Sequence, residues 1–300
     1  MGSMADFWKM FWALFKTKEE TPVVPNIPIP ISSPPVKPPV KPPVKPPVKP
    51  PATQKKKAAV CLGLIKVDPS GYGGWEGACP GCDVDAVGLN TLLIDKGFKT
   101  KLLLNAETTW KNVRANILRA AKPLKRGDLL VITMSGHGGQ LKDDNGDEKD
   151  GIDETICLWD QQVRDDEMLK LIHSLTAGIQ VVLINDQCHS EGNFRSTWKA
   201  FQRAVTMGKY GTRTATPLLR AVSDWDGQLI QYAGCREANY SYGASNGGTW
   251  TQTLLKVFDD DLTWKGWFNA ALQRMPGSQI PVWTEYGNVD DEFRAGKVLQ

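Results

Sequence analysis

A histidine and a cysteine, each placed just after a short apolar run, are the side chains of this sequence that point most directly to covalent chemistry. His137 follows the run 128–134, and Cys188 follows the run 179–185. Both runs have the length and the β-branched content of buried strands. A thiol and an imidazole form the minimal pair of nucleophile and general base. The two residues therefore predict a cysteine hydrolase.

The role expected of each residue follows from its chemistry. Cys188 attacks a carbonyl carbon as the thiolate, and His137 accepts the thiol proton and returns it to the leaving amine. Open α/β sheets place their ligands and reacting groups at the carboxyl ends of parallel strands. The positions of Cys188 and His137 after two apolar runs fit that arrangement. Taken alone, either side chain would more often be structural.

Apolar runs that read as strands alternate with amphipathic stretches that read as helices from residue 58 onward. Strands are expected at 58–67, 99–104, 128–134, 179–185, 228–233 and 279–286, and helices at 83–96, 109–122, 165–174, 249–258 and 262–274. This alternation is typical of an α/β fold whose mostly parallel sheet is flanked by helices on both faces. That sheet must position the cysteine and the histidine.

Two polar residues precede the expected catalytic pair at matching positions. Ser135 lies two residues before His137, and Asp186 lies two residues before Cys188. Residues i and i+2 of a strand project to the same face, so both side chains are expected to edge the substrate cleft. A carboxylate there would favour a basic group. The alternative is that Asp186 only caps a helix or anchors a loop.

Several longer motifs, taken in order, resemble the metacaspases, the caspase-like cysteine peptidases found outside animals. The matching segments are GCDVDA at 81–86, SGHGGQ at 135–140, NGDEKDGIDETI at 145–156, DDE at 165–167, DQCHS at 186–190, AGCRE at 233–237 and NGGTWTQTLL at 246–255. The resemblance runs through about residues 58–285. It implies a caspase-like sheet and peptide-bond hydrolysis.

The resemblance also implies roles for individual residues. The backbone N–H groups of Gly138 and Cys188 would bind the oxyanion. Asp85, with Asp186 and Ser135, would line an acidic pocket that selects protein or peptide substrates with Arg or Lys before the scissile bond. Metacaspases are usually monomers, and the basic stretch 191–227 resembles their self-processing loop.

Calcium is the cofactor that the resemblance implies, and no organic cofactor is expected. The site maps onto Asp153, Asp165 and Asp166, while Arg195 replaces a fourth aspartate of the family and Glu191 replaces a glycine after Cys-His-Ser. An EF-hand loop is excluded because position 6 of its pattern is Glu148 rather than glycine. A solvated acidic loop is the alternative.

Cys79-Pro80-Gly81-Cys82 is a CxxC motif that this function does not use. Such a motif can be a redox pair. It follows a glycine-rich loop rather than a strand, and a four-cysteine zinc site would need a second CxxC. Only Cys82 matches a family position. With six cysteines in 300 residues, the chain is not expected to be a disulfide scaffold.

The N-terminal part of the chain differs in composition from the rest. Residues 1–57 carry a net charge of +7 and the remainder −4, so the folded part is not expected to bind nucleic acid. The aromatic segment 1–20 is too short to span a membrane and fits an interfacial anchor or a partner-docking helix. The segment 21–57 contains 14 of the 20 prolines and four Val-Lys-Pro-Pro repeats, typical of a disordered, extended linker.

These observations predict a peptidase domain at 58–300 behind a proline-rich extension, in the cytoplasm, with segment 1–20 as a candidate membrane anchor. A peptidase that cuts after Lys or Arg would spare the repeat lysines, because a proline follows each of them, whereas Lys55, Lys56 and Lys57 lack this protection, so we expect the extension to be shed there. The alternative function is a catalytically weak caspase-like scaffold that acts through its proline-rich tail.

Overall fold

The computed structural model describes residues 55–142, 152–175, 177–187, 225–234 and 243–300. Segment 1–20, most of the proline-rich linker and Cys188 lie outside these residues. So does most of the basic stretch, residues 191–224. In the described part of the chain, no helix is long and apolar enough to cross a membrane.

A six-stranded sheet forms the centre of the fold, in the order β11-β8-β7-β3-β1-β2. Five strands are parallel, and β11 runs antiparallel to β8 at one edge. This arrangement confirms the mostly parallel sheet. The strands are β1 (Lys57–Gly63), β2 (Lys99–Leu104), β3 (Leu129–Ser135), β7 (Gln180–Asp186), β8 (Gln228–Ala233) and β11 (Val282–Gly287).

The two central strands are buried from end to end. Every residue of β3 and of β7 is buried. Strands of a parallel sheet covered on both faces are in contact with the core on each side, so their sequences are continuously apolar rather than alternating. The apolar runs that pointed to β3 and β7 in the sequence have this origin.

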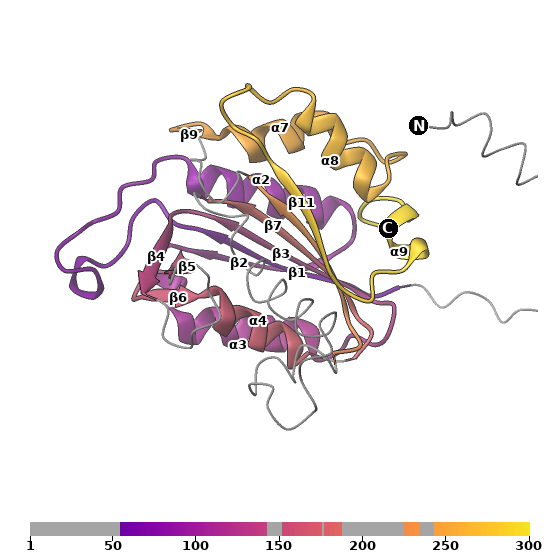
Figure 1. Ribbon diagram of the computed structural model, residues 1–300, viewed down its shortest axis with the longest axis horizontal. Helices are drawn as coiled ribbons and strands as arrows, with labels where there is room; N and C mark the ends of the chain where they lie inside the picture. The colour runs from indigo at the N-terminus through magenta and orange to yellow at the C-terminus, as the bar shows by residue number, and fades with distance from the viewer. Residues whose placement is uncertain (1–54, 143–151, 176, 188–224, 235–242) are drawn as a thin grey trace, which may run out of the picture. The chain divides into compact units, whose positions relative to one another are not determined.

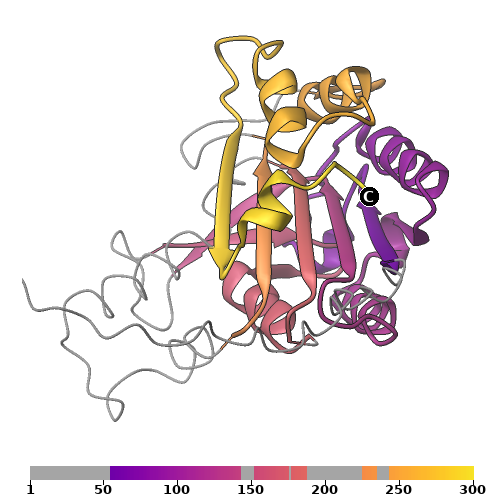
Figure 2. The same ribbon diagram turned by 90° about the vertical axis from the view of Figure 1, so that its right-hand side faces the viewer.

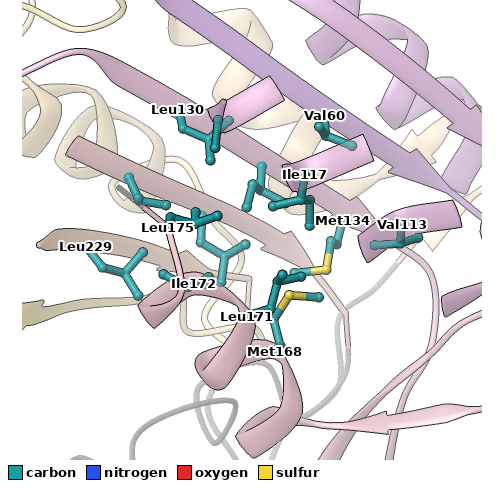
Figure 3. Packing of buried hydrophobic residues seen from close by; sticks show 14 of the residues in the cluster. Val60, Val113, Ile117, Leu130, Met134, Met168, Leu171, Ile172, Leu175 and Leu229 are labelled. Carbon is teal, nitrogen blue, oxygen red and sulfur yellow. The ribbon is translucent and has the colours of Figure 1, made fainter. Parts of the chain in front are cut away.

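Helices cover both faces of the sheet, as predicted (Figures 1 and 2). On one face lie α2 (Cys82–Asp95), α7 (Thr249–Val257) and α8 (Trp264–Leu272), packed through an aromatic-rich core. On the other face lie α3 (Trp110–Ala121) and α4 (Asp165–His173), which pack on the sheet through residues including Ile117, Met168 and Ile172 (Figure 3). A short helix, α9 (Asp291–Ala295), precedes the C-terminus.

Several short elements were not predicted as such. An antiparallel sheet of β4 (Gly138–Lys142), β5 (Ile152–Cys157) and β6 (Gln162–Arg164) follows β3, and β9 (Gly243–Ala244) pairs with β10 (Gly247–Gly248). Two 3₁₀ turns, η1 (Pro69–Gly71) and η2 (Asn105–Glu107), complete the described elements. Strands this short carry too few residues for a periodic pattern.

The compact unit that contains the sheet begins at Thr53, and the domain boundary at residue 58 stays a prediction. The lysines of the supposed cleavage site belong to the fold. Lys57 opens β1, the Lys56 N–H donates to Asp128 Oδ1, and Lys57 Nζ donates to the carbonyls of Lys96 and Leu299 at 2.6 and 3.0 Å. A backbone held in a sheet does not enter a peptidase cleft, so this geometry argues against shedding of the extension at 55–57.

Candidate active site

The carboxyl ends of β3 and β7 lie side by side. In the parallel register, Ser135 pairs with Asp186, and the Gly136 N–H donates to the Asp186 carbonyl. His137 therefore follows β3 at the same edge of the sheet at which β7 ends. Cys188 lies outside the described residues, which stop at Gln187 before it. The sheet thus brings together the two chain segments that lead to the predicted pair.

His137 is half-buried, and its ring is held by the loop that joins β1 to α2. Its Nε2 lies 3.2 Å from the Ala78 carbonyl oxygen, and the Trp75 ring centroid lies 4.9 Å from the imidazole centroid. The His137 carbonyl accepts hydrogen bonds from Gln187 Nε2 at 3.2 Å and from the Cys157 N–H at 3.0 Å. Ring and backbone are therefore both fixed.

Gly138 opens β4 directly after the histidine and pairs with Ile156 of β5. It is partly exposed, so a substrate carbonyl can approach its backbone. The sheet of β4, β5 and β6 fixes the chain around Gly138, because Gly138 pairs with Ile156 and the Cys157 N–H donates to the His137 carbonyl. The glycine retains the oxyanion role that the resemblance implies as a prediction.

Asp85 lies in the first turns of α2 and is completely buried. Its carboxylate accepts hydrogen bonds from Ser135 Oγ at 2.8 Å, from Gln252 Nε2 at 2.9 Å and from the Gly248 N–H at 3.0 and 2.8 Å. Three distant segments, α2, β3 and the start of α7, thus converge on one carboxylate. Burial raises the pKa of Asp85, and these hydrogen bonds oppose the rise.

Asp186 lies on the other side of the same glycine. Its Oδ2 accepts a hydrogen bond from the Thr251 N–H at 2.9 Å. A Cβ atom placed on Gly248 would lie 2.2 Å from Asp186 Oδ2 and 2.9 Å from Asp85 Oδ2. Both carboxylates therefore lie directly against Gly248, at a position that leaves no room for a Cβ atom. They also accept backbone N–H groups at the start of α7, so the anchoring role and the shared acidic site coexist.

The three aspartates predicted to bind calcium are buried and lie on two elements, Asp153 in β5 and Asp165 with Asp166 at the start of α4. Asp153 Oδ2 accepts a hydrogen bond from Arg164 Nε at 2.7 Å. Among the described residues, no three His, Cys, Asp or Glu side chains form a group that could hold a metal ion. Calcium binding by these three aspartates stays a prediction.

The structure therefore brings Asp85, Ser135 and Asp186 together beside the segment that carries His137 and Gly138. Sequence reasoning assigned no role to Gly248 or Gln252, although both belong to the motif NGGTWTQTLL, and it assigned none to Gln187. It also gave no role to the glycine-rich loop 71–77 or to Ala78. The contact between Ala78 and His137 could not be predicted, because it uses a backbone carbonyl, which every residue type carries.

A cavity of about 670 Å³ lies elsewhere, at the amino ends of β1 and β2. Its lining is rich in basic side chains, including Lys57, Lys99 and Arg119. The histidine follows the carboxyl end of β3, so this cavity is remote from the predicted chemistry. We therefore place the candidate site from the convergence of side chains rather than from cavity size.

Residues 57–195 match the family model described as "Metacaspase, peptidase C14 domain". The chain is 36% identical over 150 residues to Metacaspase-1 of Cryptococcus neoformans and 35% identical over 154 residues to Metacaspase-1 of Schizosaccharomyces pombe. These matches cover 45% and 46% of this chain but 32% and 35% of the relatives. The chain thus spans about a third of the length of the curated relatives it matches.

A solved structure covers more of the chain. A crystal structure of a Geobacter sulfurreducens protein superimposes with a TM-score of 0.67 at 30% sequence identity, and the match covers 81% of this chain and 98% of that protein. The structural likeness therefore extends well beyond the segment that the family model matches.

Proposed function

The chain belongs to the metacaspase family through residues 57–195, and from that premise we propose that it is a cysteine endopeptidase that cleaves peptide bonds after Arg or Lys. The observation that carries the proposal is the meeting of Asp85 and Asp186 at Gly248, beside the end of the strand that leads to His137. Family membership supports the cysteine peptidase class, and the paired carboxylates support the basic preference.

In the proposed reaction His137 is the proton carrier. A neutral imidazole that donates its Nε2–H to the Ala78 carbonyl keeps the lone pair on Nδ1, which is then free to accept the Cys188 thiol proton. The thiolate attacks the substrate carbonyl, the imidazolium protonates the leaving amine, and an acyl-enzyme remains. Water, deprotonated by the same imidazole, then releases the acid and regenerates the thiol.

The negative charge that develops on the carbonyl oxygen needs fixed donors. We assign this role to the Gly138 and Cys188 backbone N–H groups, as the family resemblance implies. Gly138 lies in β4, and a backbone donor fixed in a sheet needs little reorganisation during the reaction. Gly138 has no side chain to block the approach of the substrate.

The preference for Arg and Lys rests on charge. Two carboxylates at the edge of a cleft attract a guanidinium or ammonium group and repel an acidic side chain. Asp85 and Asp186 are both buried, so their interaction with a bound cation is screened less than on the surface. Ser135, which donates to Asp85, orients the carboxylate.

Matched fluorogenic peptides ending in Arg, Lys or Asp test the proposal, assayed with the wild-type chain and with Cys188→Ala. We expect hydrolysis of the two basic peptides only, and no hydrolysis by the variant. Hydrolysis of the Asp peptide at a similar rate would contradict the specificity. No hydrolysis of any peptide would contradict the enzyme assignment and favour the scaffold function of the proline-rich tail.

Calcium activation is a further part of the proposal. Arg164 occupies one oxygen of Asp153, so a calcium ion must compete with this guanidinium. Arg164→Gln is therefore expected to bind calcium more tightly than the wild type, seen as a larger rise in Tm with added calcium. Absence of any calcium-dependent rise in Tm in both proteins would end the calcium proposal, whatever the peptidase assay shows.

Self-processing completes the proposal. The basic residues best suited to it, including Lys199, Arg203 and Arg213, lie outside the described residues. We expect mass spectrometry of the incubated wild-type chain to find cuts after residues of this stretch and none after Lys55–Lys57, because the latter are held in the fold. Cys188→Ala is the control that must stay intact.

A further inference from the structure

The CxxC motif that the proposed reaction does not use lies next to the residues that it does use. Cys79 and Cys82 are joined by a disulfide across Pro80 and Gly81. Cys82 is the first residue of α2 and is buried, whereas Cys79 belongs to the preceding loop and is partly exposed. The bond therefore links a partly exposed loop residue to a buried residue at the start of a helix.

On the loop side, the disulfide adjoins the contacts of the histidine. The Ala78 carbonyl oxygen lies 3.2 Å from His137 Nε2, and Ala78 directly precedes Cys79. Trp75, whose ring lies against the imidazole, is three residues further back. Most of this loop is exposed, and residues 73–76, Ala78 and Pro80 have little burial of their own. The Cys79 N–H donates to the Ile65 carbonyl at 2.7 Å, which is a second tether.

On the helix side, the disulfide is attached to a rigid element. Leu89 and Leu93 of α2 are buried in the core, and Asp85, one turn after Cys82, has its full set of hydrogen bonds to β3 and α7. The disulfide thus ties the exposed loop that orients His137 to the helix that carries the carboxylate of the acidic site.

We propose that the Cys79–Cys82 disulfide is a redox modification site, reduced by a protein or small-molecule dithiol, and that its state sets how firmly the Ala78 carbonyl orients His137. The effect on catalysis rests on the proposed peptidase function, whereas the redox site and its effect on the histidine do not.

The exchange uses a dithiol as the reductant. A thiolate of the dithiol attacks Cys79 Sγ, the S–S bond to Cys82 breaks, and Cys82 leaves as a thiolate that takes up a proton. The second thiol of the reductant then attacks the mixed disulfide and releases Cys79 as a thiol. Two electrons and two protons pass to the protein, and the reductant becomes a disulfide. Cys82, at a helix N-terminus, is suited to leave as a thiolate.

Reduction is expected to free the loop rather than the helix. The helix is held by its core contacts and by Asp85, while the loop loses the covalent link beside Ala78. The hydrogen bond from the Cys79 N–H to the Ile65 carbonyl remains as the tether, so the Ala78 acceptor of the histidine is held less firmly, while the acidic site keeps its geometry. The consequence for a peptidase is a lower kcat with little change in KM for a basic peptide.

The first test does not need catalysis. In the Cys188→Ala chain with ¹⁵N-labelled histidine, His137 is one of three histidines and is assigned with His137→Gln. We expect reduction by dithiothreitol to add two alkylatable thiols by mass spectrometry and to shift the His137 ring nitrogen signals. Cys79→Ser in the same background should show the reduced-state signals with or without reductant. A His137 spectrum that is identical in all three states would overturn the proposal.

The second test measures the consequence for catalysis. Oxidised and reduced wild type and Cys79→Ser are compared on an Arg peptide, each rate divided by the amount of Cys188 that an irreversible thiol label titrates. We expect kcat of the reduced wild type and of Cys79→Ser to be about three- to tenfold below that of the oxidised wild type, at a KM unchanged within about twofold. An equal kcat overturns the control of catalysis. Failure of all three to cleave any peptide counts against the peptidase function, and the histidine spectra then decide the redox site alone.

Discussion

Asp85 and Asp186 each do two things at the residue scale. Both accept backbone N–H groups at the start of α7, which would otherwise lack partners inside the protein. Both also lie against Gly248, in the acidic site that we propose to bind a basic side chain. Burying a carboxylate is costly unless hydrogen bonds offset the lost hydration. The network around Asp85 supplies such hydrogen bonds.

Asp85→Asn is expected to abolish cleavage of basic peptides with little change in stability. The amide keeps the shape of the side chain, but its NH2 group cannot accept the hydrogen bonds that a carboxylate oxygen accepts, and the charge that pairs with Arg or Lys is gone. Burial raises the pKa of Asp85, so loss of the charge removes a desolvation cost that offsets the lost hydrogen bonds, and Tm at pH 7 should change little. Asp83→Asn, on the same helix turn, is the matched control and should retain activity. A selective, active Asp85→Asn chain would contradict the pocket.

The acid limb of the pH profile should report the same group. As the pH falls, Asp85 is protonated at a higher pH than an ordinary aspartate with a pKa of 3.8, and the pocket loses a charge. We expect kcat/KM for an Arg peptide to fall on acidification in a range above that value, mainly through KM. If the fall on acidification is in kcat alone, with KM unchanged, the titrating group is not Asp85.

Gly248→Ala should disrupt the acidic site by crowding. The added methyl would lie 2.2 Å from Asp186 Oδ2, so the buried Asp186 side chain would have to move. Overpacking of this kind costs about 1–3 kcal/mol of unfolding free energy. Gly277→Ala is the control, since a Cβ there meets no atom within 4 Å. Equal Tm and activity for the two variants would show that the glycine is not under this constraint.

At the element scale, α4 packs its last turn against the chain that leads into β8. His173 stacks on Trp225 with ring centroids 4.6 Å apart, and burial lowers the pKa of His173 to about 4. His173 is thus neutral in the folded protein at physiological pH and serves as an aromatic packing residue. This agrees with the absence of His173 from the candidate site and with its position in a helix on the opposite side of the sheet from α2.

The lowered pKa makes a prediction about stability and pH. The unfolded chain binds a proton at His173 near pH 6.5, whereas the folded chain does so only near pH 4, so stability present above pH 6.5 is lost as the pH falls towards 4. We expect His173→Phe, which keeps the stacking ring, to lose less Tm than the wild type between pH 7 and pH 4.5. Parallel Tm curves for the two proteins would show that His173 does not contribute.

At the scale of the whole molecule, the two ends of the parallel strands carry different features. The acidic site and the histidine lie at the carboxyl ends of the parallel strands, while the basic cavity and the entry of the chain at Lys55–Lys57 lie at the amino ends. Residues 53–300 form one compact unit. Lys56 and Lys57 are anchored within this unit by hydrogen bonds to Asp128, Lys96 and Leu299.

Removal of residues 1–52 should therefore leave the folded unit intact. We expect the shortened chain to keep its Tm within about 2 °C, because no described contact of the unit is removed. A further cut that removes Lys55–Lys57 is the comparison, and it should lower Tm by deleting the start of β1 and the hydrogen bonds of Lys57. Size-exclusion chromatography of the same samples tests the predicted monomer.

The sequence alone determined the parts that local pattern controls. Continuous apolar runs marked β3 and β7 because both faces of a central strand are buried, and the helix expected at 109–122 begins there because the Thr109 side chain caps the Asn112 N–H. The motifs around His137 and Cys188 carried the resemblance to the metacaspases. Some element ends and the short strands β6, β9 and β10 were missed, because pairing with distant segments rather than local propensity defines them.

Only the tertiary structure decided which groups meet. Asp85, Ser135 and Gly248 are far apart in sequence, and their hydrogen bonds exist because α2, β3 and α7 pack against one another. The contact of the Ala78 carbonyl with His137 depends on a loop fold that no residue type announces. The hydrogen bond from Arg164 to Asp153, a predicted metal ligand, was likewise not predicted from the sequence. Residue types limit what chemistry a chain can perform, but distances between side chains remote in sequence are set by packing.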